Sequence, residues 1–436
     1  MGKIVNFNEL NSGNELRKVA LRIAEAGLEA IDSAKAVREA LRLEGNRIKV
    51  DEENFEIEKE SKVLVIGVGK CAIEAAKAAE EILADTVTSG VVLDVRENNI
   101  CKFKKIDYFK GTHPFASEQN VKATQIIVET LAGLSKNDFV LFLISGGGST
   151  LLCLPPEGHN YLDEKVILKE LFIVGAPIHE INTIRKHMSL ARGGYLAKHA
   201  YPARVASILF SDVPGNDLSI IASGPTVRDE TTVAFANAIL SKYGILKRCS
   251  LEHDRLIETP KEKKYFEHVY NFLAISNQRA LEAMRKQAEK LGFKTIIKSE
   301  QISGEAREVG ESIAEEITAA PFKSVLLYGG ETTVTVKNRD GKGGRNQELA
   351  LSALRWIKKG DNVLVLSLAS DGKDNSEYAG ALVDRVTHNK TEAMHLNISD
   401  YLEKNDSQNF FEKIGDVIIT GDTGSNVSDL IIAIKS

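Results

Sequence analysis

The sequence lacks the features that mark membrane, disulfide-rich and metal-cluster proteins. Its 436 residues include only four cysteines, Cys71, Cys101, Cys153 and Cys249, and no two of them form a CxxC pair. Structural zinc and iron–sulfur sites need clustered thiolates, so neither is expected. No apolar run approaches the ~18–20 residues needed to cross a bilayer, and the start MGKIVNFNEL lacks the apolar core of a signal peptide. We therefore expect a cytoplasmic protein in a reducing compartment, with no membrane partner.

An excess of positive charge is also missing. The formal net charge is -5 and the pI is about 6.1. A dedicated nucleic-acid binder needs a basic footprint, so no nucleic-acid partner is expected. Hydrophobic residues make up 43% and charged residues 27%, which is an ordinary globular balance. The length predicts two to three domains, each large enough to bury a core of its own.

The hydrophobic pattern alternates between short apolar runs and helical periodicity. Helical spacing over 14–44 precedes an apolar run at 63–66, and further runs lie at 90–95, 139–144 and 205–210. After a polar stretch at 247–264, the alternation resumes as far as 417–420. This order is typical of α/β domains with mainly parallel sheets. We predict a Rossmann-like domain over 1–250, a second α/β domain over 265–436 and an active site in the cleft between them.

Glycine-rich turns follow several of the predicted strands. The first, Gly67-Val68-Gly69-Lys70-Cys71-Ala72, matches the GxGxxA dinucleotide fingerprint, and Asp94 ends the next strand where a ribose-binding acid would lie. An NAD(P)-dependent reductase of hydroxypyruvate or a similar 2-oxo acid is therefore one candidate function. Such a turn can also simply reverse the chain. Lys70 favours a different ligand, because a cation at a helix N-terminus suits terminal phosphates.

Further strand-end loops add anion-binding and acidic groups. Ser145-Gly146-Gly147-Gly148-Ser149 predicts a nest of backbone N–H groups for an anion. Asp212 follows the strand at 205–210, where a carboxylate serves as a general base, a metal ligand or a helix cap. Arg345 lies near a helix start, which disfavours a cation unless it binds a phosphate or carboxylate. The basic run Arg185-Lys186-His187 is either a solvated helix face or a site for a small carboxylate.

Eight motifs in fixed order resemble one family. They are GVGKCA, LISGGGSTLL, NTIRKHMSLARGG, SDVPGNDLSIIASGPT, YGGETTVTV, GKGGRNQELAL, ASDGKDN and TGDTGSNVSDL. Together they closely resemble the class II, MOFRL-type glycerate 2-kinases from about Lys62 to the C-terminus. A P-loop and the protein-kinase motifs are both absent from the sequence, so those nucleotide-binding classes are excluded.

The resemblance implies phosphorylation of D-glycerate at its 2-hydroxyl by ATP, assisted by Mg²⁺. It makes Lys70, Asp212 and Arg345 the catalytic candidates, with Asp212 as general base or, together with Asp371, as a magnesium ligand. The phosphate and substrate-binding candidates are Ser145, Gly146, Gly147, Gly148, Ser149, Arg185, Lys186 and His187. The nucleotide-binding candidates are Gly67, Gly69, Gly329, Gly330, Glu331, Asp371 and Asn426. The oligomeric state stays open, and a homodimer is compatible with the sequence.

Overall fold

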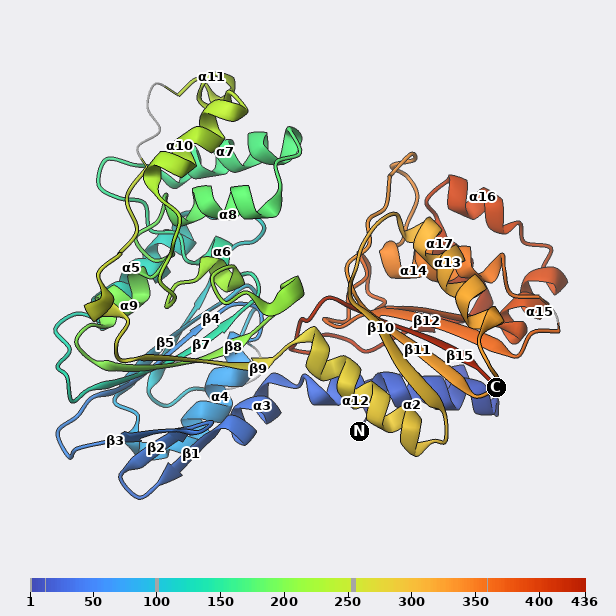
Figure 1. The fold of residues 1–436 in the computed structure, drawn as a ribbon, viewed down its shortest axis with the longest axis horizontal. Helices are drawn as coiled ribbons and strands as arrows, with labels where there is room; N and C mark the ends of the chain where they lie inside the picture. The colour runs from blue at the N-terminus through green and yellow to red at the C-terminus, as the bar shows by residue number, and fades with distance from the viewer. Residues whose placement is uncertain (1, 12, 99–101, 252–255, 359) are drawn as a thin grey trace. The chain divides into compact units, whose positions relative to one another are not determined.

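The chain folds into two compact units, and the sequence passes from one unit to the other twice. The computed structural model describes residues 2–11, 13–98, 102–251, 256–358 and 360–436. One unit, here called the central unit, comprises Ser33–Ile275, and the other, the terminal unit, comprises Met1–Asp32 together with Ser276–Ser436. Both are α/β structures (Figure 1). Cys101, and residues 252–255 within the predicted domain boundary, lie outside the described residues.

The central unit is built on a fully parallel sheet in the order β6-β5-β4-β7-β8-β9. The strands are β4 (Val63–Val68), β5 (Ser89–Asp94), β6 (Ile106–Lys110), β7 (Phe139–Ser145), β8 (Arg204–Phe210) and β9 (Val269–Ile275). Strands β4 and β7 are buried along their whole length, as the continuous apolar runs predict for a sheet covered on both faces. The carboxyl ends of β4 and β7 lie side by side, and the glycine-rich turns follow the strands at this end of the sheet.

Helices cover both faces of this sheet. They are α3 (Ser33–Ala40), α4 (Ala72–Leu83), α5 (Glu118–Thr130), the single turn α6 (Gly148–Leu151) and α9 (Tyr195–Ala200). A separate helical group packs around its own apolar core and consists of α7 (Tyr161–Ile173), α8 (Ile178–Lys186), α10 (Val233–Lys242) and α11 (Ile245–Cys249). The antiparallel strands β1 (Leu41–Glu44), β2 (Arg47–Val50) and β3 (Glu53–Glu56) form a small meander.

The terminal unit has a mixed sheet in the order β10-β11-β15-β12-β13-β14. Its strands are β10 (Lys294–Ile302), β11 (Ser324–Gly330), β12 (Val363–Ala369), β13 (Gly380–Asp384), β14 (Val417–Ile418) and β15 (Asp429–Lys435). Only β10 and β11 pair in parallel, and every other pair is antiparallel. The prediction of a mainly parallel sheet was therefore wrong for this unit. The reason is that β13 follows β12 without a helical crossover and the C-terminal β15 inserts between β11 and β12, running antiparallel to both.

Two helix layers sandwich the sheet of the terminal unit (Figure 1). Helices α2 (Glu15–Ala30) and α12 (Asn277–Lys290) lie on one face, and α13 (Ala306–Ala319) and α14 (Arg345–Leu354) lie on the other. The remaining helices are α1 (Phe7–Asn11), α15 (Arg385–Ala393), α16 (Ile398–Glu403) and α17 (Ser407–Ile414). Because α2 packs on α12, residues 1–32 group with the C-terminal half, whereas the sequence pattern assigned them to the first domain.

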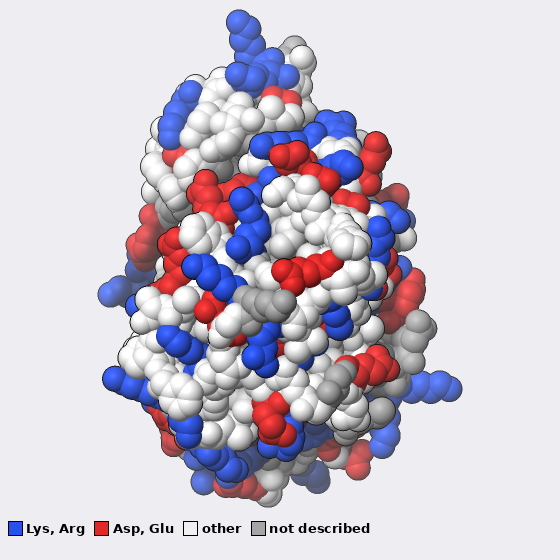
Figure 2. Space-filling model, turned by 90° about the vertical axis from the view of Figure 1, so that its right-hand side faces the viewer, with Lys and Arg blue, Asp and Glu red and all other residues white. Residues whose placement is uncertain are grey.

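The surface and the helix lengths agree with the composition. On the face shown in Figure 2, basic and acidic side chains are interspersed and do not form one basic patch. Among the described residues, no helix is both long and apolar enough to span a membrane.

Candidate active site

Three strand-end turns of the central unit are joined at one edge of the sheet. The turn after β4 holds Lys70, the turn after β7 holds Gly146 and Gly147, and Asp212 follows β8. The backbone N–H of Lys70 donates to the carbonyl of Gly146 at 3.0 Å, and that of Cys71 donates to Ser145 Oγ at 3.1 Å. The turns after β4 and β7 are thereby fixed to each other by hydrogen bonds.

Glycine is required where these turns touch. Gly69 has φ +122°, and a Cβ at this position would lie 2.1 Å from Ser145 Oγ and 2.6 Å from the Ser145 carbonyl oxygen. Any side chain at Gly69 would therefore separate the two turns. The two turns also lie beside the loop after β8, because Ser149 Oγ accepts a hydrogen bond from Ser223 Oγ at 2.9 Å.

Lys70 and Asp212 lie against neighbouring glycines. A Cβ on Gly146 would fall 1.9 Å from Asp212 Oδ2, and a Cβ on Gly147 would fall 3.2 Å from Lys70 Cγ. Lys70 follows β4 and Asp212 follows β8. The ends of these two strands therefore bring a lysine side chain and a carboxylate against the consecutive glycines that follow β7. Lys70 is half-buried, and no carboxylate in the described part of the chain pairs with its ammonium group. Such a site offers one group that can accept a proton and one that can stabilise negative charge.

The dinucleotide fingerprint does not present a free phosphate site. The N–H of Cys71 is bound by Ser145, and the N–H of Ile73 donates to Asp94 Oδ2 at 3.3 Å, so the first turn of α4 is capped by protein groups. Asp94 is fully buried and receives both Nε and Nη2 of Arg96, at 3.2 and 3.0 Å. In the structure, Gly67 and Gly69 are therefore tight-packing residues, and Asp94 faces an arginine rather than a ribose.

The basic run on α8 separates into two environments. Lys186 donates to Asp229 at 3.1 Å, and the His187 ring bonds the Ile257 carbonyl at 2.8 Å and Thr231 at 3.2 Å. Both side chains are buried within this network. Arg185 differs, because its Nε is buried and has no partner among the described residues. Only Arg185 of the three therefore retains capacity for a ligand.

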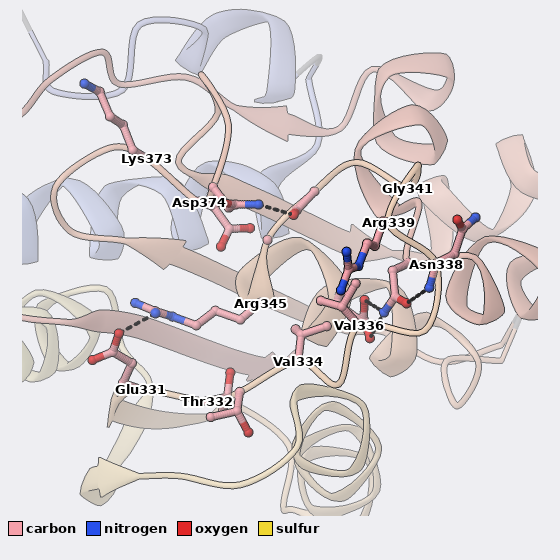
Figure 3. Close-up of a pocket in the computed structure, with 16 residues that line it drawn as sticks. Glu331, Thr332, Val334, Val336, Asn338, Arg339, Gly341, Arg345, Lys373 and Asp374 are labelled. Carbon is pink, nitrogen blue, oxygen red and sulfur yellow. Dashed lines mark hydrogen bonds and ion pairs between the residues drawn. The ribbon is translucent and has the colours of Figure 1, made fainter. Parts of the chain in front are cut away.

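A second cluster lies in the terminal unit around Arg345, the first residue of α14. Its Nε and Nη2 donate to Asp429 at 2.6 and 3.0 Å, and its Nη1 pairs with Glu331 (Figure 3). The Asp429 side chain is 2% exposed, whereas that of Glu331 is 53% exposed. Burial raises the pKa of Asp429 to about 6, against the lowering effect of the Arg345 fork. Asp429 fixes the guanidinium, and the exposed Glu331 is the partner that an incoming anion can replace.

Asp374 explains why α14 begins where it does. Its Oδ1 accepts the N–H of Asn346 at 3.0 Å, and its Oδ2 accepts the N–H of Gln347 at 2.8 Å. The two amide side chains bond the same oxygens at 3.2 Å. With both oxygens occupied, Asp374 acts as a buried helix cap. Within the described part of the chain, the Asp371 side chain instead accepts only the N–H of Lys373, at 3.0 Å, and it stays partly exposed.

The remaining nucleotide candidates have structural partners. A Cβ on Gly329 would meet Asn277 at 1.8 Å, and one on Gly330 would meet the Ile302 backbone at 2.4 Å, so both glycines allow close packing. Asn426 caps the turn that leads into β15 by accepting the N–H of Ser428 at 3.2 Å.

A pocket of about 650 Å³ adjoins Arg345 within the terminal unit (Figure 3). Its walls combine apolar side chains such as Val334 and Val336 with the cations Arg339 and Lys373 and the carboxylates Glu331 and Glu348. Asn405 supports one wall, because its Oδ1 accepts the N–H of Lys337 at 2.8 Å. The volume lies in the range of small-molecule sites, and the walls offer both an apolar surface and charged groups to a ligand.

Some site residues could not be identified from sequence. Asp429 is 84 residues from Arg345, and it lies in a motif in which Asn426 was the chosen candidate. His113 follows β6 in a loop without glycine enrichment, yet its ring lies 3.7 Å from the position of a Cβ on Gly147. Within the described residues, no group of three or more His, Cys, Asp or Glu side chains could hold a metal ion.

Comparisons with known proteins give a consistent family. Residues 19–258 match the model of DUF4147, a domain of unknown function, and residues 324–429 match the MOFRL family. The glycerate 2-kinase of Pyrococcus horikoshii is 38% identical over 96% of this chain and 97% of its own. The crystal structure of a glycerate kinase from Thermotoga maritima superposes with a TM-score of 0.84 at 36% identity, covering 97% of this chain and 100% of that one. An Agrobacterium vitis protein provisionally named hydroxypyruvate reductase is 36% identical over 84% of this chain and 86% of its own.

Proposed function

The chain belongs to the MOFRL-type glycerate 2-kinase family, and we propose that it transfers the γ-phosphoryl group of ATP to the 2-hydroxyl of D-glycerate. The products are 2-phosphoglycerate and ADP. The observation that supports this most directly is the placement of Lys70 and the Asp212 carboxylate against consecutive glycines, Gly147 and Gly146. A hydroxyl nucleophile needs a proton acceptor on one side and positive charge around the phosphoryl group on the other.

We assign the proton transfer to Asp212. Its carboxylate accepts the proton of the 2-hydroxyl as the oxygen attacks phosphorus, and the bond to the ADP oxygen breaks. A positioned general base is typically worth ~10²–10⁴ in rate. The glycine turn at 146–148 supplies backbone N–H groups beside the reacting centre, with the hydroxyls of Ser145 and Ser149 at its two ends.

We assign the stabilisation of transition-state charge to Lys70 and Arg345. The equatorial oxygens of the transferring group carry distributed negative charge, and a comparable arginine elsewhere is worth ~10³–10⁵. Asp429 holds Arg345 by two hydrogen bonds, so that its planar fork is oriented before substrate binds. Lys70 belongs to the central unit and Arg345 to the terminal unit.

Mg²⁺ is part of the proposal. This ion usually keeps several waters and is bound by one or two carboxylates together with substrate phosphates. The partly exposed Asp371 and the strand-end Asp212 fit that donor set, whereas Asp374 does not, since both of its oxygens already accept two N–H groups each. When bound, Mg²⁺ neutralises phosphate charge on the nucleotide.

We propose that the pocket beside Arg345 binds part of the nucleotide. Val334 and Val336 offer an apolar surface to a base, and Lys373 offers charge to phosphates. We further propose a cytoplasmic location, which the free thiols of Cys71, Cys153 and Cys249 support. The homodimer stays a prediction that light scattering behind size-exclusion chromatography would test.

One experiment decides between the kinase and the reductase. The protein is incubated with D-glycerate, ATP and Mg²⁺, and the products are read by ³¹P NMR, which separates 2-phosphoglycerate from 3-phosphoglycerate. A parallel reaction follows NADH consumption with hydroxypyruvate. We expect 2-phosphoglycerate and ADP in the first reaction and no NADH oxidation in the second. Activity in the second reaction alone would overturn the proposal, although Asp94 and the capped α4 turn speak against it.

A further inference from the structure

Two side chains, Lys70 and His113, lie against the glycine turn of the central unit, and a third, Arg185, interacts electrostatically with His113. Lys70 and His113 both lie beside Gly147, at 3.2 and 3.7 Å from the position a Cβ would take there. Partial burial of the His113 ring, together with the positive charges of Lys70 and Arg185, lowers the pKa of the imidazole. Among the described residues no carboxylate pairs with Lys70, and the buried Nε of Arg185 has no partner.

We propose that Arg185 and His113, together with Lys70, bind the carboxylate of the substrate and so select a 2-hydroxy acid over an uncharged alcohol. This inference rests on the proposed kinase function and adds the groups that read the acid. Its basis is the placement of Lys70 and His113 against Gly147, together with the buried Arg185 Nε that has no partner among the described residues.

The surroundings of Arg185 favour the binding of an anion. Burial, together with the neighbouring charge of Arg192, lowers the pKa of Arg185 to about 10, and Glu164 opposes this only in part. Glu164 is already engaged, because it accepts from Arg192 Nη1 at 2.8 Å. Two arginines therefore share one carboxylate, and a bound anion would restore the balance of charge.

Arg192 acts as a positioning residue for Arg185. Its Nη1 also donates to the carbonyl oxygen of Arg185 at 3.1 Å, and the Arg192 side chain is fully buried. This contact fixes the last turn of α8, from which the Arg185 side chain extends. A guanidinium presented by a fixed backbone suits a planar carboxylate, because the two can form parallel hydrogen bonds.

His113 lies on a loop that is anchored beside the same turn. Asn120 Nδ2 donates to the carbonyls of Thr112 and Thr150 at 3.0 and 3.1 Å, and Thr150 Oγ1 donates to that of Pro114 at 3.2 Å. The loop on both sides of His113 is thereby joined to α6. The His113 side chain itself stays exposed, which leaves it accessible to a ligand.

The covalent structure of the substrate explains why these groups adjoin the proposed base. In a 2-hydroxy acid, the carboxylate is attached directly to the carbon that carries the reacting hydroxyl. A site that places the hydroxyl at Asp212 must therefore bind the carboxylate one bond away. Asp212 lies against Gly146, and Lys70 and His113 lie against the next residue, Gly147, so the proposed base and the proposed carboxylate site are adjacent.

The test pairs a protein variant with a substrate variant. D-Glycerate is compared with D-glyceramide, in which a neutral amide replaces the carboxylate, for the wild type, R185Q, R185K and H113N. Loss of a hydrogen bond to a charged group predicts a rise of about 10- to 100-fold in the KM of R185Q for D-glycerate. The preference of the wild type for D-glycerate over D-glyceramide should shrink by a similar factor, with the KM for ATP unchanged. R185K should retain part of the preference, and H113N should weaken it while folding normally, since His113 is exposed.

K169Q is the control for a general loss of positive charge. The Lys169 ammonium lies 5.5 Å over the Phe115 ring, near the His113 loop, and is not part of the proposed site. This variant should keep the preference for the acid. An R185Q enzyme whose KM for ATP rises while its preference for the acid persists would show that the group binds phosphate, and would overturn the proposal. An unchanged preference and unchanged KM values would overturn it as well.

Direct binding separates this inference from the kinase proposal. If the wild type shows no phosphoryl transfer, the proposed function fails, and calorimetric titration without ATP still tests the anion site. Selective binding of D-glycerate over D-glyceramide that R185Q abolishes would support the site. Equal binding of the two compounds by the wild type would reject it.

Discussion

The ammonium group of Lys70 is the clearest single-residue test of the proposed chemistry. The ammonium group of Lys70 has no carboxylate partner among the described residues. Lys70→Ala therefore leaves no buried carboxylate without a cation, and the fold should not be destabilised. We expect kcat to fall by at least ~10²-fold while the melting temperature stays close to that of the wild type. Lys77→Ala, on the helix α4 that follows the Lys70 turn but outside the site, should retain full turnover. Near-normal kcat in Lys70→Ala would remove this residue from the mechanism.

Asp212→Asn distinguishes a base from a metal ligand. The amide cannot accept the hydroxyl proton, so we expect a loss of ~10²–10⁴ in kcat. The Mg²⁺ concentration for half-maximal activity should change little. Initial rates over a Mg²⁺ titration measure both quantities, and a large rise in the Mg²⁺ requirement with modest loss at saturation would assign Asp212 to the metal instead.

Asp429 should act on catalysis through Arg345. Asp429→Asn removes the charge that orients the guanidinium, and we expect kcat to fall by about 10- to 100-fold. Arg345→Ala should cost at least as much. In the double variant the two losses should not add, because both substitutions disable the same group. Full additivity of the logarithms of kcat would show that Asp429 has a separate role, and Arg355→Ala, at the exposed end of α14, is the matched control.

The sequence indicated candidate residues for the site but not their partners. Lys70 and Arg345 stood out because a cation at a helix start is unfavourable without an anion. Nothing local to Arg345 indicated Asp429, since that contact depends on β15 lying beside β11. For the same reason the sequence could not separate Arg185 from Lys186 and His187, whose burial depends on Asp229 and Ile257.

At the scale of elements, the site depends on how closely strand-end turns can approach. Gly146→Ala tests this, because the added Cβ would lie 1.9 Å from Asp212 Oδ2 and must displace the carboxylate. Gly146 is not among the positive-φ glycines, so backbone strain is not the cause. We expect kcat to fall by at least ~10-fold as the base moves. Gly360→Ala, with open space around its Cβ and no positive φ, should leave kcat and melting temperature unaltered.

Periodicity identified most elements but not the pairing of all strands. The buried run at 139–144 forms β7 as predicted, because a strand covered on both faces must be apolar throughout. The strands β13 and β15 were not predicted. Their antiparallel pairing depends on chain reversals, and the apolar content of β15 alone does not encode its neighbours. The amphipathic pattern at 14–44 likewise indicated helices without showing that α2 packs on α12.

At the scale of the whole chain, a buried ion cluster ties the N-terminal helix to the C-terminal half. Arg17 on α2 bonds Asp384 at 2.7 and 2.8 Å and Asp416 at 2.9 Å, and all three side chains are nearly fully buried. Burial alone would raise the pKa of Asp384, but the hydrogen bonds and charge of Arg17 outweigh it and lower that pKa. Within the terminal unit, residues from both ends of the chain thus meet at the Arg17 guanidinium.

Arg17→Met should therefore destabilise the protein in a pH-dependent way. Removing one member of a buried ion cluster costs about 3–5 kcal/mol, because the remaining carboxylates are left without a cation. The stability that Asp384 gains from its lowered pKa is present above its usual pKa and is lost as pH falls through the folded value. In the variant, Asp384 stays buried but loses the cation that lowers its pKa, so it is expected to take up a proton above that range and the stability of the variant should rise as pH falls from 7 towards 5. The difference from the wild type, measured by urea unfolding, should be largest at pH 7 and should narrow on acidification. Arg22→Met, on the exposed face of α2, should show neither effect, and an equal loss for Arg17→Met at both pH values would mean that packing rather than charge holds the helix in place.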